Sequence, residues 1–339
     1  MRQARRDFLK LAAASGVAAP LFGRELLAQT RPKVRVQIGW IPNVQYAGEW
    51  IALDRGLLTA QGIDVEWYPG GPNALPAPVM LAAGRADLGY STWFPFIDAV
   101  AQGNDLVMIA AVFPKNPLGI ISLAKKPIRE PKDLVGARIL AQGPNEKTAI
   151  EATLSLAGLP VQWTQVPAGF SPEPLLAGDG DGYTAFGTNQ TITLERMGLV
   201  RGKDFHFVSF DELGFRTYGA VLMTTRRYLD ANRPQVVAYV RGIIKGWEQN
   251  EADPKVAAEL AVKKYGADFG LDLPQQIRQN ELQIPLTRYE GAPRPRLALD
   301  REVIEGPMFR AARATGRTKL PDVDRAVDFS LVPEAHRGL

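Results

Sequence analysis

The 339-residue sequence contains no cysteine and only two histidines. Without cysteine the chain forms no disulfide, thiolate nucleophile, cysteine-ligated zinc site or iron–sulfur cluster, and it lacks the residue that carries the lipid of bacterial lipoproteins. His206 lies in DFHFVSF, whose alternation is typical of a strand, and His336 lies near the C-terminus. GDGDG (178–182) lacks the closing Glu of a calcium loop. We therefore expect no metal and no cofactor.

Dense runs of Lys and Arg with interleaved aromatic residues are absent after residue 30. The net charge is +4, of which the first 28 residues contribute +3 and the rest +1. This balance argues against nucleic acid as a partner. The composition, 46% hydrophobic and 22% charged, is that of an ordinary globular chain long enough for two lobes.

The first 28 residues have the layout of an export signal. A basic start precedes an apolar run from Leu11 to Phe22, which is too short to span a bilayer of about 30 Å. Arg5-Arg6-Asp7-Phe8-Leu9-Lys10 resembles the twin-arginine signal, with Ala4 in place of the usual Ser or Thr. We expect cleavage near Ala28 and a protein that is periplasmic, soluble and not lipid-anchored. The alternative is a basic amphipathic N-terminus on a cytoplasmic protein.

Beyond the signal, strand and helix patterns alternate along the chain, which predicts mainly parallel sheets with helices on their faces. Predicted strands lie at 33–40, 63–69, 86–91, 106–113, 118–126, 137–142, 161–167, 181–186, 205–210 and 218–225. Predicted helices lie at 46–56, 73–84, 92–103, 145–158, 189–198, 234–250, 254–266, 274–284 and 301–316.

The charged, proline-containing stretch 125–132 separates two βα series. We therefore predict a first lobe of residues 32–124 plus 219–339, which includes C-terminal helices, and a second lobe of residues 125–218.

Aromatic and amide residues recur where the predicted strands end, which is where open α/β sheets bind ligands. Helix starts beside them offer free N–H groups and a partial positive charge. The candidate ligand-binding residues are Trp40, Pro42, Asn43, Tyr46, Tyr90, Ser91, Trp93, Asn116, Glu146, Gly187, Thr188, Asn189, Gln190 and Tyr218. Trp40 and Trp93 also have a core interpretation. Gly70-Gly71 is first a turn, because it lacks the spacing and the Lys of a phosphate loop.

A family resemblance rests on several pieces in a fixed order. GWIPNVQYAGEWIALDRGLLTAQGIDVEWYPGGP, LAAGRADLGYS, AAVFPKNPLGIISL, IREPKDLVGARI, GYTAFGTNQTITLERMG and YGAVLMTTRRYLDANRPQVVAYVRGIIKGWE together resemble the solute-binding proteins of ABC importers. The branch is the one that shares its fold with the fungal thiamine-pyrimidine synthases and neighbours the sulfonate, nitrate and taurine binders. The resemblance covers about residues 34–270. It departs at Gln45-Tyr46, where pyrimidine binders often have Asn-His, and at PGGP, which is commoner in relatives with other heteroaromatic ligands.

The resemblance implies an α/β fold of the type II periplasmic-binding-protein class, a two-lobe clamp in which each lobe is a mostly parallel sheet flanked by helices. Hinge strands would cross near 121–128 and 214–222. A flat ring would stack on Trp40, Tyr46 or Trp93. Polar side chains that would read its nitrogens and amines are Asn43, Asn116, Glu146, Asn189 and Gln190. The implied partners are a small-molecule ligand and the membrane permease of an ABC importer, and we expect a monomer.

Three functions compete. The first is an extracytoplasmic binding protein for an aminopyrimidine thiamine precursor. The second is the same scaffold binding riboflavin or a sulfonate, taurine or nitrate, although no Arg stands in the first-lobe loops. The third is the pyrimidine synthase itself, an enzyme whose family uses a site histidine and a cysteine-rich motif. Because this chain has no cysteine and no histidine in a first-lobe loop, we expect a non-enzyme.

Overall fold

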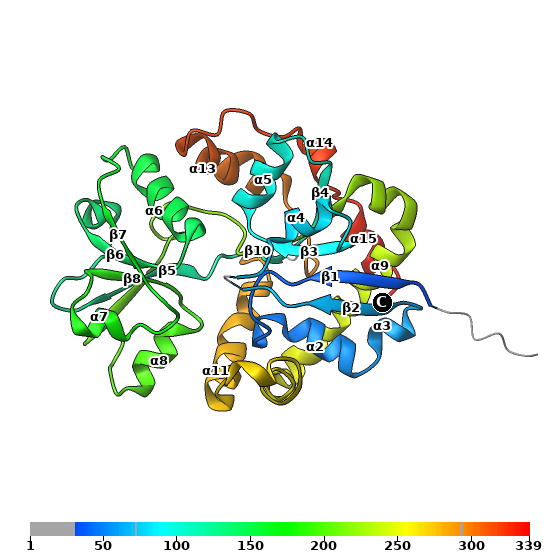
Figure 1. Cartoon of the computed structure of the whole chain (residues 1–339), viewed down its shortest axis with the longest axis horizontal. Coiled ribbons are helices and arrows are strands. Elements are labelled where there is room, and N and C mark those ends of the chain that lie inside the picture. Colours follow the sequence, from blue (N-terminus) through cyan, green and yellow to red (C-terminus); the bar gives the residue numbers. More distant parts are fainter. Residues whose placement is uncertain (1–30, 72, 292–293) are drawn as a thin grey trace, which may run out of the picture. The chain divides into compact units, whose positions relative to one another are not determined.

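Two five-stranded mixed sheets form the framework of this α/β fold in the computed structural model, which describes residues 31–71, 73–291 and 294–339 (Figure 1). The first sheet has the order β2 (Asp64–Tyr68), β1 (Lys33–Gln37), β3 (Leu88–Ser91), β10 (Ala220–Thr225), β4 (Leu106–Phe113). The second has the order β7 (Thr164–Pro167), β6 (Arg138–Ala141), β8 (Gly182–Phe186), β5 (Leu118–Leu123), β9 (Phe205–Ser209). We call the parts built on these sheets the first and second lobes.

Each sheet is parallel except for the strand that enters it from the other lobe. β10 runs antiparallel to β3 and β4, and β5 runs antiparallel to β8 and β9. β4 is buried along its whole length, as expected for a strand covered on both faces. The predicted alternation of strands and helices is confirmed.

Helices cover both sheets. Those before β5 are α2 (Ala47–Asp54), α3 (Leu57–Ala60), α4 (Ala77–Ala82) and α5 (Trp93–Ala101). Those between β5 and β9 are α6 (Pro144–Leu156), α7 (Glu173–Ala177) and α8 (Gln190–Arg196). Those after β10 are α9 (Arg226–Ala252), α10 (Pro254–Leu260), α11 (Leu273–Gln283), α12 (Arg301–Val303), α13 (Phe309–Ala314), α14 (Val323–Ala326) and α15 (Leu331–His336).

Short 3-10 and π turns complete the described elements. The 3-10 turns are η1 (Val44–Tyr46), η2 (Pro131–Leu134), η4 (Ala267–Phe269) and η5 (Ile284–Thr287). The π turns are η3 (Ala261–Tyr265) and η6 (Ile304–Met308).

The chain crosses between the lobes earlier than we predict from the sequence. β5 pairs with β8 and β9, so the first crossing is the loop 114–117 and not the stretch 121–128. The predicted lobe boundary at 124/125 therefore misplaces β5. The reason is that β4 and β5 are both apolar and buried, and hydrophobicity does not say which sheet a strand joins. The return crossing is 210–219, which overlaps the predicted 214–222.

The long helix α9 is two helices joined at a break. The Thr225 side chain caps the first by accepting from the backbone N–H of Tyr228, at 3.1 Å. Asn232 has non-helical backbone angles (φ −133°, ψ 27°), and Pro234 then stands near the start of the second helix. Proline is tolerated there because the first N–H groups of a helix have no intrahelical partner. This explains why the sequence predicts a helix only from residue 234.

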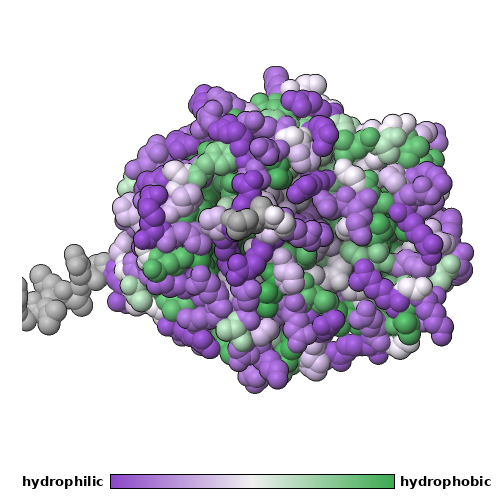
Figure 2. All heavy atoms as spheres, turned by 180° about the vertical axis from the view of Figure 1, so that it is seen from behind, coloured by the Kyte–Doolittle hydropathy of each residue, from purple (hydrophilic) through white to green (hydrophobic). Residues whose placement is uncertain are grey.

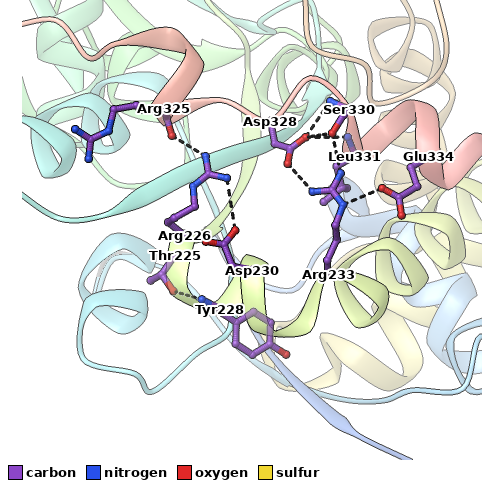
Figure 3. Close-up of polar contacts among 10 residues, drawn as sticks. All are labelled: Thr225, Arg226, Tyr228, Asp230, Arg233, Arg325, Asp328, Ser330, Leu331 and Glu334. Carbon is purple, nitrogen blue, oxygen red and sulfur yellow. Dashed lines mark hydrogen bonds and ion pairs between the residues drawn. The ribbon is translucent and has the colours of Figure 1, made fainter.

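Arginines of α9 fasten the C-terminal segment to the first lobe (Figure 3). The Arg233 guanidinium donates to Asp328 at 2.7 Å and to Glu334 at 2.9 Å, and Arg226 donates to the backbone carbonyl of Arg325 at 2.8 Å. These bonds join α14, α15 and the loop between them to α9.

Figure 2 shows the face opposite to that of Figure 1 as hydrophilic residues interrupted by small hydrophobic patches, which is ordinary for a globular surface. Across residues 31–71, 73–291 and 294–339, no helix combines the length and the apolar character that a membrane span requires.

Candidate functional site

A cavity of about 600 Å³ lies between the two lobes. It is lined by the loops that follow β1, β2 and β3 in the first lobe and β6, β7 and β8 in the second, together with the first residues of β5 and β10. Because β5 and β10 are antiparallel to their neighbours, their starts meet the carboxyl ends of the other strands. The cavity therefore occupies the sheet edges where α/β proteins bind ligands, and its volume is in the usual range for small molecules.

Eight of the fourteen candidate residues line this cavity. Five come from the first lobe and three from the second: Trp40, Asn43, Tyr46, Tyr90, Ser91, Glu146, Asn189 and Gln190. Residues more than a hundred positions apart in the sequence are thus brought together.

The Trp40 loop is held by close backbone approach from Gly70 and Gly71. The Gly70 N–H donates to the carbonyl of Trp40 at 3.0 Å. A Cβ on Gly70 would lie 2.4 Å from the carbonyl oxygen of Ile38, so only glycine fits. Gly71 has a φ of +131°, which also favours glycine. Both glycines line the cavity, and the turn shapes its wall.

Buried amides of α11 hold the next turn, η1. The Asn43 side chain caps η1 by accepting from the backbone N–H of Gln45 at 2.9 Å. The Val44 N–H donates to Gln276 at 2.9 Å, and the Val44 carbonyl accepts from Gln283 at 2.7 Å. These bonds satisfy backbone groups that burial would otherwise leave unpaired, and they fix the position of Asn43 at the cavity.

A buried hydrogen-bond chain lies behind the first-lobe wall. The Tyr90 hydroxyl donates to the carboxyl of Glu49 and lies 3.1 Å from the Tyr239 hydroxyl. Burial raises the pKa of Glu49 from its ordinary 4.5 to about 7, although the bond from Tyr90 opposes the shift. The second carboxyl oxygen of Glu49 has no hydrogen-bond partner among the residues described. Tyr90 is thereby fixed as part of the wall and is not free to turn toward a ligand.

Glu146 stands in the first turn of α6, where the helix dipole favours a negative charge. Burial nevertheless raises the pKa of its carboxyl, against hydrogen bonds from its own backbone N–H, the Asn145 side chain and the backbone of Gly143. Among the described residues that line the cavity, Glu146 is the one carboxylate, and there is no Lys, Arg or His. The described residues hold no group of three or more Asp, Glu or His side chains that could bind a metal ion.

Six candidate residues lie outside the lining, and three of them have clear structural roles. Trp93 is in the core, where it stacks near Phe309 with ring centroids 5.9 Å apart and donates to the Met308 carbonyl. Trp93 thus has the core role that the sequence also allows, and it is not part of the cavity wall. The Asn116 amide joins the two crossings, because it donates to Thr217 at 3.1 Å and accepts from the N–H of Leu118 at 3.0 Å.

Tyr218, on the return crossing, is also committed to the framework. Its hydroxyl lies 2.9 Å from the Tyr289 hydroxyl and accepts from the N–H of Asp300 at 2.9 Å. Pro42, Gly187 and Thr188 lie beside the cavity loops but not in the lining. Gly187 packs against the Phe207 ring, and a Cβ there would lie 2.5 Å from it.

Phe170 and Gln142 also line the cavity, and neither is among the residues predicted from the sequence. Phe170 follows β7, so the strand-end rule applied to that strand would have found it. Gln142 directly follows β6. Its amide donates to the Thr184 carbonyl at 2.9 Å and accepts from the Thr184 hydroxyl at 2.6 Å, which makes it a brace for the second-lobe wall.

Several side chains bridge the lobes around the cavity. The Thr92 hydroxyl donates to Asn145 at 3.1 Å, and Arg196 of α8 pairs with Asp272 at the start of α11. The Gln275 amide donates to Asn189 at 2.8 Å. The lobes are therefore in contact on more than one side of the cavity.

Comparison with known protein families assigns the chain to one of them. Residues 43–257 match the family described as NMT1/THI5 like, a match that covers more than half of the chain. The chain belongs to the NMT1/THI5-like family. This assignment agrees with the resemblance found in the sequence. The matched region of this NMT1/THI5-like chain includes cavity-lining residues of both lobes, such as Asn43 and Asn189, and begins just after Trp40.

Individual relatives of this NMT1/THI5-like protein have different roles. The chain is 24% identical over 268 residues to the formylaminopyrimidine-binding protein of Halalkalibacterium halodurans, covering 76% of this chain and 78% of that one. It is 24% identical over 221 residues to the 4-amino-5-hydroxymethyl-2-methylpyrimidine phosphate synthase of Schizosaccharomyces pombe, covering 62% of this chain and 63% of the synthase.

Among solved structures, the periplasmic aliphatic sulphonate binding protein SsuA of Escherichia coli matches with a TM-score of 0.66 at 17% identity. The match covers 89% of this chain and 98% of that one. The fold is thus the two-lobe α/β fold of periplasmic binding proteins.

Proposed function

We propose that this protein is the extracytoplasmic substrate-binding protein of an ABC importer and that it binds a small, uncharged heteroaromatic molecule such as an aminopyrimidine thiamine precursor. The observation that carries the proposal is the composition of the cavity wall. Among the residues that the structure describes, aromatic rings and neutral amides line it, with one carboxylate and no basic side chain.

This wall suits a flat ring with polar edges. Rings that stack on Trp40 gain about 0.5–1.5 kcal/mol beyond the burial of their area. Glu146 is placed to accept a hydrogen bond from an exocyclic amine. The first-named relative binds formylaminopyrimidine, which carries such a ring, and this supports the choice of ligand.

The remaining assignments follow from this role. The ligand would touch the eight lining candidates and Phe170, and the closed protein would dock on the importer's membrane permease. We propose that the N-terminal 28 residues direct twin-arginine export, although they lie outside the described residues. The mature protein would be a periplasmic monomer without a lipid anchor, and closure would turn on the two crossings.

Binding of riboflavin or of a sulfonate, taurine or nitrate is the second candidate. The volume of the cavity and the PGGP turn favour a larger ring such as the flavin. The absence of Lys, Arg and His from the lining, together with the carboxylate of Glu146, disfavours an anion because its buried charge would be uncompensated.

An enzymatic role as a pyrimidine synthase is the weakest candidate. His206 is on β9 beside Arg129, and His336 contacts the Arg296 carbonyl, so neither described histidine lines the cavity. We therefore favour a binding role without catalysis.

Calorimetry and solution scattering on the purified mature protein test the proposal. Formylaminopyrimidine should bind, raise the melting temperature and reduce the radius of gyration, since only a ligand that prefers the closed state shifts the hinge equilibrium. Riboflavin and taurine are the comparison ligands. Compaction by taurine with no response to either heteroaromatic compound would contradict the choice of ligand and leave the two-lobe clamp intact.

A further inference from the structure

Three amide side chains of the cavity share one arrangement: in each, the oxygen accepts a hydrogen bond from the protein itself. Asn43 accepts from the N–H of Gln45 at 2.9 Å, and Gln190 accepts from the N–H of Phe186 at 3.0 Å. Asn189 accepts from the side-chain amide of Gln275 at 2.8 Å.

These bonds decide which end of each amide faces the ligand. A backbone N–H only donates, so the amide oxygens of Asn43 and Gln190 must point to it, and the NH₂ groups are left over. Within the described part of the chain, no residue accepts a hydrogen bond from the amide nitrogen of Asn43, Asn189 or Gln190. The cavity therefore presents hydrogen-bond donors from both lobes.

Asn189 differs from the other two because its orientation depends on the opposite lobe. Gln275 belongs to α11 of the first lobe, while Asn189 follows β8 of the second, and Gln275 does not line the cavity. The same Gln275 NH₂ lies 3.3 Å from the Thr193 hydroxyl. Its own backbone N–H donates to Asp272, which caps α11 and pairs with Arg196. Gln275 is thus held in place at the junction of α8 and α11.

We infer that Gln275 is a positioning residue for the ligand site, which turns the NH₂ group of Asn189 into the cavity when the lobes meet and completes a set of three amide donors with Asn43 and Gln190. The ligand class that this set recognises is a neutral heteroaromatic compound with several acceptor atoms on its edge, ring nitrogens or carbonyl oxygens, and an amine for Glu146. The inference rests on the proposed function and refines its ligand.

Isosteric replacements test the donor set. In Asn43→Asp and Gln190→Glu the internal hydrogen bond is kept, because a carboxylate oxygen accepts from the same backbone N–H and Asp caps as well as Asn does. The ligand-facing NH₂ is exchanged for an oxygen, and one negative charge is added. Each variant should bind formylaminopyrimidine about ten- to hundredfold more weakly, since a donor is lost and two acceptors then face each other. Gln190 is half-buried, so Gln190→Glu folds even if Asn43→Asp does not.

Gln275→Glu tests the positioning role. Glu at 275 has no N–H to donate, so Asn189 is free to reverse and present its oxygen, and binding should weaken about tenfold. If Asn189 had the opposite orientation, a carboxylate at 275 would accept from its NH₂ and binding would be unchanged. Gln165→Glu, which adds the same charge at an exposed position of β7, is the control and should leave the affinity unchanged.

The results separate this inference from the proposed function. If Asn43→Asp, Gln190→Glu and Gln275→Glu all bind formylaminopyrimidine as tightly as the native protein, the donor set is wrong and the proposed function stands. If the native protein binds taurine and not formylaminopyrimidine, the proposed function and the heteroaromatic class are wrong. In that case the three variants are measured with taurine, and unchanged affinity for its sulfonate overturns the donor set as well.

Discussion

Trp40 and Phe170 meet edge to face across the cleft, with ring centroids 5.4 Å apart and an interplanar angle of 86°. One ring comes from the loop after β1 and the other from the loop after β7, so the contact joins the two lobes at the cavity. Phe170 is 47% exposed, so it keeps much of its ring surface in solvent.

Removal of either ring should weaken ligand binding without unfolding the protein. Trp40→Ala should cost about 1–3 kcal/mol of binding free energy because the stacking surface is lost, and Phe170→Ala about 0.5–1.5 kcal/mol. Calorimetry with formylaminopyrimidine measures both. Phe269→Ala is the control, since Phe269 is 44% exposed and lies outside the lining. Unchanged affinity in Trp40→Ala would mean that Trp40 is structural, and a lost melting transition would assign it to the core.

Arg196 and Asp272 should favour the closed arrangement while adding little to stability. Both side chains are partly exposed, so Arg196→Asp should have little effect on the free energy of unfolding. It should also increase the radius of gyration in solution scattering, because the two lobes then carry facing negative charges. Lys203→Asp, which makes the same charge change at an exposed position of the second lobe, is the control and should leave the radius of gyration unchanged. An unchanged radius of gyration in Arg196→Asp as well would argue that the ion pair does not influence closure.

Glu49 should make the protein less stable as the pH rises from about 5 to 8. The folded-state pKa of about 7 lies above the ordinary 4.5, so the folded protein holds the proton more tightly than the unfolded chain does. The contribution of Glu49 to the free energy of unfolding is fully present below pH 4.5, the ordinary pKa. It is lost as the pH rises through about 7, the folded-state pKa, and the total loss is about 3 kcal/mol.

Urea unfolding at several pH values measures this effect. Glu49→Gln should remove the decline in stability with pH. The free energy of unfolding of the native protein minus that of the variant should therefore fall as the pH rises from about 5 to 8. Glu259→Gln, at an exposed position, should run parallel to the native protein. Parallel curves for Glu49→Gln as well would show that Glu49 has an ordinary pKa in the fold.

Export should depend on Arg5 and Arg6. Replacement of both by Lys should leave the precursor in the cytoplasm, because the twin-arginine route recognises the pair and not the charge alone. Cell fractionation with immunoblotting measures the mature form. Its normal appearance in the periplasm would rule out this route, and a variant with Lys10→Gln provides a control for general loss of positive charge.

Much of the fold follows from local patterns in the sequence. Period-two alternation in 33–40 and apolar runs such as 106–113 specify strands, and glycines after helical stretches specify where helices stop. Since parallel strands end at one sheet edge, the loops after them are predictable site positions, which is why Trp40, Asn43, Glu146 and Asn189 were found.

The sequence by itself therefore determined the α/β class, the order of the elements and the loops that reach the cleft, because these depend on neighbours in the chain. Only the tertiary structure decided which sheet β5 joins, since its apolar residues suit either one. Only the structure decided that Trp93 belongs to the core and that Phe170 faces Trp40. It also decided that Gln275 holds Asn189 from the opposite lobe. Such contacts join residues that are far apart in the sequence. Their partners are selected by packing and hydrogen bonding in three dimensions, which no local pattern records.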